Sequence, residues 1–197
     1  MDSNFHFGPA QSGEVTAYGA RTPDASLASI VEWADFMRAK GITRVCCLLD
    51  AGQLAGFSVN LEAEYKRLFG VTCVLMEPIA DHHLCSPQAL RENILPFLRT
   101  ADSGSERAVI HCWGGNGRTG HVLAAWLVGA RGLSPVEAIT AVEASGRLPQ
   151  EAVLAGNATL DELIELLVSA NLTTQPNPRL EPSANRDREC RGSIANH

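Results

Sequence analysis

Two kinds of apolar run alternate along roughly the first 170 residues of the chain. Continuous, β-branched runs occupy residues 42–49, 71–76 and 108–111. Such runs are typical of strands buried on both faces of a sheet. Two shorter runs near the amino terminus, 5–7 and 15–18, have a similar composition. The pattern therefore predicts five strands.

Helical runs lie between these strands, and most begin at a capping residue followed by apolar positions three and four residues apart. The predicted helices span 22–40 and 61–69, begin at 86, span about 119–129, and begin at 134 and 159. Thr22 is the expected N-cap of the first, and Pro96 is expected to kink the third. Alternating strands and helices predict an α/β fold with a central, mostly parallel sheet flanked by helices.

One domain accounts for most of the 197 residues, and we expect it to span 1–172. Residues 173–197 are polar and have few apolar side chains, so we expect them to form a disordered tail. The start of the chain has no apolar signal segment, and no run is long enough to cross a membrane.

The formal net charge of −6 argues against a nucleic-acid partner, which would require a basic surface, and against a polybasic membrane anchor. Neighbouring Cys46 and Cys47 do not resemble half of a disulfide framework, and the C-x-x-C spacing of zinc sites is absent from the sequence. Both observations favour a reducing, cytoplasmic location and a protein without a metal.

Residues 109–120, which read VIHCWGGNGRTG, carry the clearest chemistry. A strand ends at Cys112, glycines follow, and Arg118 begins a helix. A helix N-terminus attracts anions, and glycines allow a loop to turn its amides inward around a phosphate. A thiol in that field ionises readily to the nucleophilic thiolate. The predicted phosphate-binding residues are Trp113, Gly114, Gly115, Asn116, Gly117 and Arg118.

The alternative for this segment is a structural cysteine beside a glycine-rich turn. That alternative suits a lone cysteine, but here five positions fit one chemical template, namely His111, Cys112, Gly115, Arg118 and Thr119. A planar guanidinium at Arg118 can also bind two phosphoryl oxygens at once. The segment is therefore interpreted as a catalytic phosphate loop.

This segment resembles the signature H-C-x-x-G-x-x-R-[ST] of the cysteine-dependent protein tyrosine and dual-specificity phosphatases. The resemblance is tight at the loop and looser over residues 10–170. It implies a phosphocysteine intermediate, no cofactor, a Thr119 hydroxyl bonded to the cysteine sulfur, and His111 as a support for the thiolate. The chain is too short for the insertions of the classical tyrosine-specific members, so the dual-specificity type is expected.

A second motif supplies the candidate general acid. Pro78-Ile79-Ala80-Asp81 matches the P-I-x-D loop of the resembled family. Asp81 lies 31 positions before Cys112, which is about the distance between this loop and the cysteine in that family. The resemblance therefore implies Asp81 as acid and base. Asp50 and Glu77 are rivals, and adjacent His82 and His83 are expected to be exposed.

The predicted function is hydrolysis of phosphomonoesters, with a phosphorylated protein as the expected substrate, phosphotyrosine first. Trp113 and Asn116 carry no charge, which disfavours highly anionic headgroups. The alternatives are RNA 5′-phosphates or inositol phosphates, sulfur transfer, and a non-catalytic phosphate-binding module. His121 is expected on a helix surface. Cys47 and Cys85 either pack in the core or resolve an oxidised Cys112.

Overall fold

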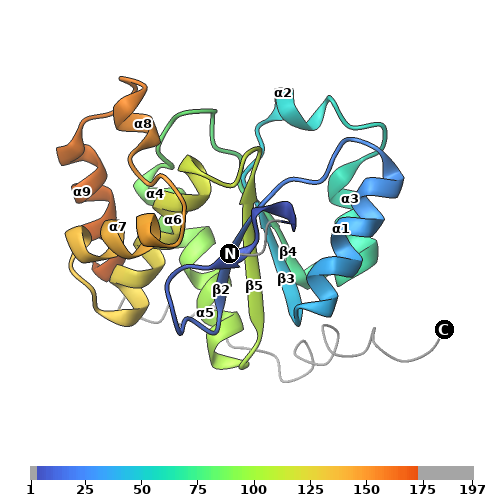
Figure 1. The fold of residues 1–197 in the computed structure, drawn as a ribbon, viewed down its shortest axis with the longest axis horizontal. Helices are drawn as coiled ribbons and strands as arrows, with labels where there is room; N and C mark the ends of the chain where they lie inside the picture. Colours follow the sequence, from blue (N-terminus) through green and yellow to red (C-terminus); the bar gives the residue numbers. More distant parts are fainter. Residues whose placement is uncertain (1–3, 173–197) are drawn as a thin grey trace.

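A five-stranded sheet between two layers of helices forms the centre of the computed structural model, which describes residues 4–172 (Figure 1). The strand order is β1-β2-β5-β3-β4, with only the β1–β2 pair antiparallel. The strands are β1 (Gly8–Pro9), β2 (Ala17–Arg21), β3 (Ile42–Cys47), β4 (Val74–Met76) and β5 (Arg107–Cys112). The predicted α/β fold is confirmed, and the predicted tail lies outside the described residues.

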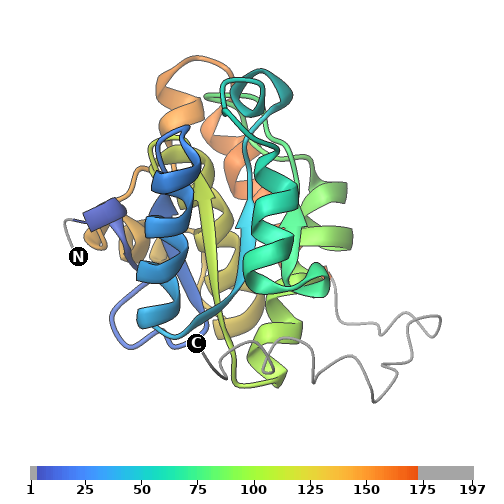
Figure 2. The ribbon, with the colours of Figure 1, turned by 90° about the vertical axis from the view of Figure 1, so that its right-hand side faces the viewer.

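Different helices cover the two faces of the sheet (Figures 1 and 2). α1 (Leu27–Ala39) and α3 (Leu61–Phe69) pack on one face, where Trp33 and Tyr65 are fully buried. The helices whose apolar side chains share the core on the other face are α5 (Leu95–Ser103), α6 (Gly117–Arg131), α7 (Pro135–Ala144) and α9 (Leu160–Ser169). The short helices are α2 (Ala51–Leu54), α4 (Pro87–Ala89) and α8 (Glu151–Leu154). Within residues 4–172 no helix has the length and apolar content that a membrane span requires.

Strand β5 occupies the centre of the sheet and delivers Cys112 to its carboxyl edge. It is parallel to both neighbours, with Cys112 opposite Arg21 of β2 and His111 opposite Cys47 of β3. Ligand sites of open α/β sheets lie beyond the carboxyl ends of such strands. The loop that joins β5 to α6 is therefore at the position where this architecture binds ligands.

Most predicted helix starts are confirmed, but the first is wrong. Ser86, Ser134 and Thr159 cap their helices through side-chain hydrogen bonds to the backbone. The first helix is capped by Ser26 instead of Thr22. The Thr22 amide donates to the Cys112 carbonyl at 2.9 Å, because the pairing of β2 with β5 continues past the end of the strand.

The amino-terminal strand predicted at 5–7 is also wrong. Asn4–His6 forms a short turn that is not helical at Phe5, and Phe5 and His6 have φ values of 56° and 51°. The Phe5 and Phe7 rings both pack against Phe36, with ring centres 5.3 and 5.6 Å away. Side chains two residues apart share one face in a strand too, so the evidence against a strand is the positive φ of Phe5 and His6, which lies outside the β region.

Two other predicted elements differ in detail. In the predicted strand 71–76, Val71–Cys73 is a 3₁₀ turn and only Val74–Met76 joins the sheet. The irregularity expected at Pro96 takes the form of a π-helical turn, Leu90–Ile94, immediately before α5. A proline has no amide to donate, and π-helical turns occur mostly as single interruptions within α-helices.

Candidate active site

The loop between β5 and α6 places a sulfur beside a hydroxyl at the start of a helix. Cys112 is 3% exposed, and the Thr119 hydroxyl donates to its Sγ at 3.2 Å. Helix α6 begins at Gly117, and the side chain of its N-cap, Asn116, makes no capping bond. The first-turn amides of a helix have no partner within the helix and carry positive potential. The loop therefore offers an anion site next to the sulfur.

Two loop glycines are required by close approach. Gly115 has a φ of +75°, and a Cβ there would lie 2.6 Å from the Ala20 carbonyl oxygen. A Cβ on Gly117 would lie 2.0 Å from Oε2 of Glu151. Larger residues at either position would displace the loop from β2 or from α8.

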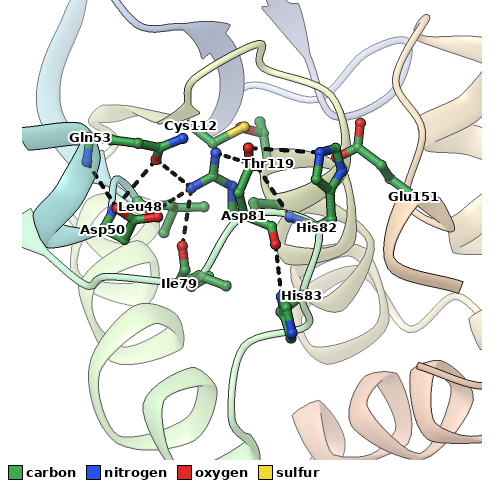
Figure 3. Close-up of polar contacts among 12 residues, drawn as sticks. Leu48, Asp50, Gln53, Ile79, Asp81, His82, His83, Cys112, Thr119 and Glu151 are labelled. Carbon is green, nitrogen blue, oxygen red and sulfur yellow. Dashed lines mark hydrogen bonds and ion pairs between the residues drawn. The ribbon is translucent and has the colours of Figure 1, made fainter. Parts of the chain in front are cut away.

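Arg118 is 2% exposed, and its guanidinium contacts the loop that contains Asp81. Its Nη2 lies 2.7 Å from Oδ1 of Asp81. Its Nη1 donates to Oε1 of Gln53 at 2.7 Å and to the Ile79 carbonyl at 3.0 Å. The Thr119 hydroxyl contacts Cys112 and the Arg118 guanidinium contacts Asp81. Figure 3 shows Cys112, Thr119 and Asp81 in the same region of the molecule.

The Asp81 loop is tied to neighbouring segments. The Asp81 side chain is 47% exposed, and Nε2 of His82 lies 3.8 Å from its Oδ2. Nδ1 of His82 lies 3.7 Å from Oε2 of Glu151 (Figure 3). Asn157 donates to the His82 carbonyl at 3.0 Å, and His82 has a φ of 56°. These contacts hold the acid loop over the start of α6.

A separate cavity of about 360 Å³ is lined by residues from the segment 83–87, from 157–158 and from α9. It is lined by His83, Leu84, Cys85, Pro87, Asn157, Ala158, Glu162, Glu165 and Leu166. None of the predicted catalytic or phosphate-binding residues lines it, so the candidate active site is the surface formed by the phosphate loop.

His111 faces the core under α1 and α3. Its ring contacts those of Trp33 and Tyr65 edge-on, at 5.2 and 5.6 Å. Burial lowers the pKa of His111 to about 3, so the ring is neutral under ordinary conditions. A neutral ring adds no positive charge beside the sulfur, and His111 can support the thiolate only through packing and the position of the backbone.

The prediction for His121 is wrong, because this residue is buried and not on a helix surface. Its Nδ1 contacts the Gly117 carbonyl at 3.1 Å, and its Nε2 accepts from the Cys85 amide at 3.2 Å. The amide partner assigns the proton to Nδ1. Burial lowers the pKa of His121 to about 4. The neutral ring thus connects α6 to the segment that follows the acid loop.

Comparison with known proteins agrees with this geometry. A family described as the DSP-PTPase phosphatase of polymorphic toxin systems matches residues 18–131, more than half of the chain. The chain belongs to this family. It is a cysteine-dependent phosphatase, and the predicted relationship to the tyrosine and dual-specificity phosphatases is confirmed. No curated protein matches the chain.

Solved structures of phosphatases share the fold. Tk-PTP in its active form is 29% identical to this phosphatase, with a TM-score of 0.58 over 76% of this chain and 92% of that one. PTPMT1 in complex with PI(5)P is 14% identical, with a TM-score of 0.65 over 86% and 99%. Kinase associated phosphatase with its catalytic cysteine changed to serine is 23% identical, with a TM-score of 0.59 over 75% and 86%.

The structure places the other candidate residues of the phosphatase as follows. The Trp113 side chain is 50% exposed at the rim of the loop. The rivals for the acid role have other partners, since Asp50 caps α2 and Glu77 accepts from Asn93 at 2.8 Å.

Burial raises the pKa of both Cys47 and Cys85 to about 12. Their thiols are therefore protonated, and a resolving role for either stays a prediction.

Sequence reasoning missed several residues around the loop. Gln53 forms a capping box with Asp50, and the D-x-x-Q pattern is visible in the sequence although its contact with Arg118 is not. Glu151, His6 and Arg147 also reach the loop. No spacing connects these three residues to Cys112, so no sequence signal could have identified them.

Proposed function

We propose that this phosphatase hydrolyses phosphomonoesters, phosphotyrosine in proteins first and phosphoserine or phosphothreonine also, through a phosphocysteine on Cys112. The contact between Arg118 and Asp81, next to a sulfur held by Thr119, carries the proposal. These contacts support a nucleophile, a phosphate ligand and a proton donor that act on one phosphorus atom. Positioning and charge stabilisation are the main sources of catalysis in phosphoryl transfer.

The reaction has two balanced steps. The Cys112 thiolate attacks phosphorus, the bond to the leaving oxygen breaks, and Asp81 donates its proton to that oxygen. Water then attacks phosphocysteine, Asp81 accepts a proton from it, and the thiolate and inorganic phosphate are released. Thr119 donates a hydrogen bond to the departing sulfur. A phosphate bound by Arg118 would replace Asp81 at Nη2, which turns the carboxyl group toward the leaving oxygen.

Charge around the loop favours substrates with one phosphate. Trp113 and Asn116 are uncharged, and the carboxylate of Glu151 lies over Gly117. A second phosphate close to the first would meet this carboxylate without a compensating surface cation from the loop. Inositol polyphosphates are therefore poorer candidates than a phosphorylated side chain.

A substrate panel tests the proposal. Phosphotyrosine and phosphothreonine peptides are compared with RNA 5′-phosphates and inositol phosphates, and kcat/KM is measured for each. We expect the phosphotyrosine peptide to be the best substrate. Cys112→Ser should lower turnover by at least about 10⁴-fold and still bind phosphate. Cys46 is a buried thiol outside the loop, so Cys46→Ser should retain turnover. Higher kcat/KM for RNA or inositol substrates would contradict the protein substrate.

The metal-free reaction stays a prediction and needs its own measurement. Vanadate should inhibit turnover and EDTA should not, because the loop and Arg118 supply the positive charge. Turnover of thiosulfate with inert phosphate esters would instead support sulfur transfer. Binding of phosphate without any turnover would support the non-catalytic alternative.

The family description suggests where the activity is used. A phosphatase that serves a polymorphic toxin system would harm a cell that contains it by removing phosphate from that cell's proteins. Induced expression in a bacterium should then slow growth, and Cys112→Ser at equal abundance should not. Equal growth of both strains would contradict a toxic role and leave the hydrolase proposal intact.

A further inference from the structure

The carbonyls of the phosphate loop are bound by residues that lie outside the segment shared with the family. Nη1 of Arg147 donates to the Gly115 carbonyl. Nδ1 of His6 contacts the Gly114 carbonyl at 3.1 Å. Both residues lie beyond 18–131, His6 at the amino terminus and Arg147 after α7. Two separate parts of the chain therefore contact consecutive peptide groups of the loop.

Arg147 is 4% exposed and is surrounded by backbone oxygens. Its Nη2 donates to the carbonyls of Gly19 at 2.7 Å and His6 at 3.0 Å. A Cβ on Gly19 would lie 2.5 Å from Cζ of Arg147, so only glycine permits this approach. Burial lowers the pKa of Arg147 to about 10. This value is still well above neutral pH, so the guanidinium is charged at pH 7. One side chain thus ties the loop to β2 and to the amino-terminal turn.

His6 forms a second bridge. Its Nε2 contacts the Gly146 carbonyl at 3.1 Å, next to Arg147, while its Nδ1 faces Gly114. Both partners are acceptors, so the ring can donate to either one, and the imidazolium form to both. The left-handed turn that presents His6 is held by aromatic packing, with the Phe7 ring stacked on Tyr18 at 5.3 Å. An unusual backbone conformation is retained where surrounding contacts require it.

The direction of a peptide group connects these contacts to phosphate binding. The carbonyl of residue 114 and the amide of residue 115 belong to one planar group and point in opposite directions. The same holds for residues 115 and 116. Holding both carbonyls on the outer side of the loop directs the following amides toward the inner side, where an anion would be bound.

We propose that His6 and Arg147 are positioning residues that hold the phosphate loop in its anion-binding conformation from the outside, so that the amino-terminal turn is part of the active site. This inference rests on the proposed function, because it assigns the loop to phosphate. We call these two residues the outer clamp. A guanidinium that only stabilised the fold would affect the unfolding temperature but not the affinity of the loop for phosphate.

The test measures binding apart from turnover. Affinity for inorganic phosphate is determined by calorimetry in the Cys112→Ser background, and unfolding temperature is recorded for the same samples. His6→Ala should weaken phosphate binding roughly 5- to 10-fold, the range expected for one lost hydrogen bond. His6→Gln, which keeps an amide donor, should recover part of that loss. Arg147→Lys should weaken binding by about 10-fold or more, because an ammonium cannot reproduce the planar fork. Arg67→Lys on the exposed surface of α3 is the matched control.

Kinetics of the enzyme with Cys112 intact provide the second measurement. The clamp variants should raise KM and the inhibition constant of phosphate, while the dependence of kcat on leaving-group acidity stays that of the parent. Wild-type phosphate affinity in folded His6→Ala and Arg147→Lys would overturn the proposal. If Arg147→Lys fails to fold, His6→Ala alone decides. A parent that binds phosphate but hydrolyses nothing would contradict the proposed function and leave the clamp measurable, whereas a parent that binds no phosphate would contradict both.

Discussion

Arg118 belongs to the phosphate loop and Arg147 contacts it. Both arginines are buried, but they bind different groups. Arg118 contacts the side chains of Asp81 and Gln53 in addition to backbone carbonyls. The hydrogen bonds found for Arg147 all end on backbone carbonyls, from the loop, β2 and the amino-terminal turn. A partly exposed carboxylate can rotate away and be replaced by a phosphate, but a backbone carbonyl cannot. The comparison indicates that Arg118 is placed to exchange partners and Arg147 to remain fixed.

The largest expected effect separates the two arginines. Arg118→Lys should lower kcat/KM by about 10³-fold, because a lysine cannot hold two phosphoryl oxygens in one plane. Arg147→Lys should lower kcat/KM far less, mainly by raising KM. Parallel measurements of kcat and KM on p-nitrophenyl phosphate check this. Equal losses in the two variants, divided in the same way between kcat and KM, would remove the distinction.

Asp81 is the partner that Arg118 is expected to exchange, so its replacement sharpens the comparison. Asp81→Asn should lower kcat roughly 10²-fold for substrates with poor leaving groups and much less for activated aryl phosphates, because only the former require a proton. Asp35→Asn, a surface residue on α1 that pairs with Arg38, is the control. Equal losses on both substrates would contradict the acid role.

The sequence was most informative where the residues with chemical roles lie close together along the chain. Cys112, Arg118 and Thr119 lie within eight consecutive positions, and a strand followed by glycines and a helix is encoded locally. The strands at 42–49 and 108–111 were identified for a similar reason, since they are buried on both faces and lack the alternation of exposed strands. At the phosphate loop the hydrophobic pattern and the residue types therefore lead to the same prediction.

The outer clamp could not be predicted, because its contacts join residues far apart in the chain. His6 contacts Gly114, 108 positions away, and Arg147 contacts Gly19, 128 positions away. The alternation of Phe5, His6 and Phe7 has the period of a strand, so this pattern predicted the wrong element. The backbone at Phe5 and His6 has positive φ and forms a turn instead, and the Phe5 and Phe7 rings both contact Phe36.

Thr119 has a smaller expected effect and acts on the inner side of the loop. Thr119→Val keeps the shape of this buried side chain but removes the hydroxyl that donates to Sγ of Cys112. A hydrogen bond to a charged group contributes about 1.5–3 kcal/mol, so hydrolysis of phosphocysteine should slow by about 10-fold or more. Rapid-quench measurements should then show a burst of product. Thr100→Val, on the exposed face of α5, is the control, and an unchanged second step would contradict the role.

The smallest effect concerns His121, which connects α6 to the segment that follows the acid loop and is expected to bind no phosphate. Burial lowers the pKa of His121 from 6.5 to about 4, so between these values the unfolded chain binds a proton that the folded protein does not. Stability therefore rises with pH in this window and falls as the pH drops from 7 to 5. Buried His111, whose pKa is lowered to about 3, acts in the same direction. Each histidine should contribute a loss of about 2 kcal/mol over that interval.

Urea unfolding at pH 7, 6 and 5 measures this dependence. His121→Gln should be less stable than the parent at pH 7 but lose less stability on acidification, because one of the two neutral buried rings is absent. Leu123→Val, a buried change on the same helix without a titrating group, should lower stability at every pH and retain the parent's slope. If His121→Gln kept the full slope, the ring would not be the neutral connection between α6 and the Cys85 segment that its hydrogen bonds indicate. The acid loop would then be held by its contacts with Arg118, Asn157 and Glu151.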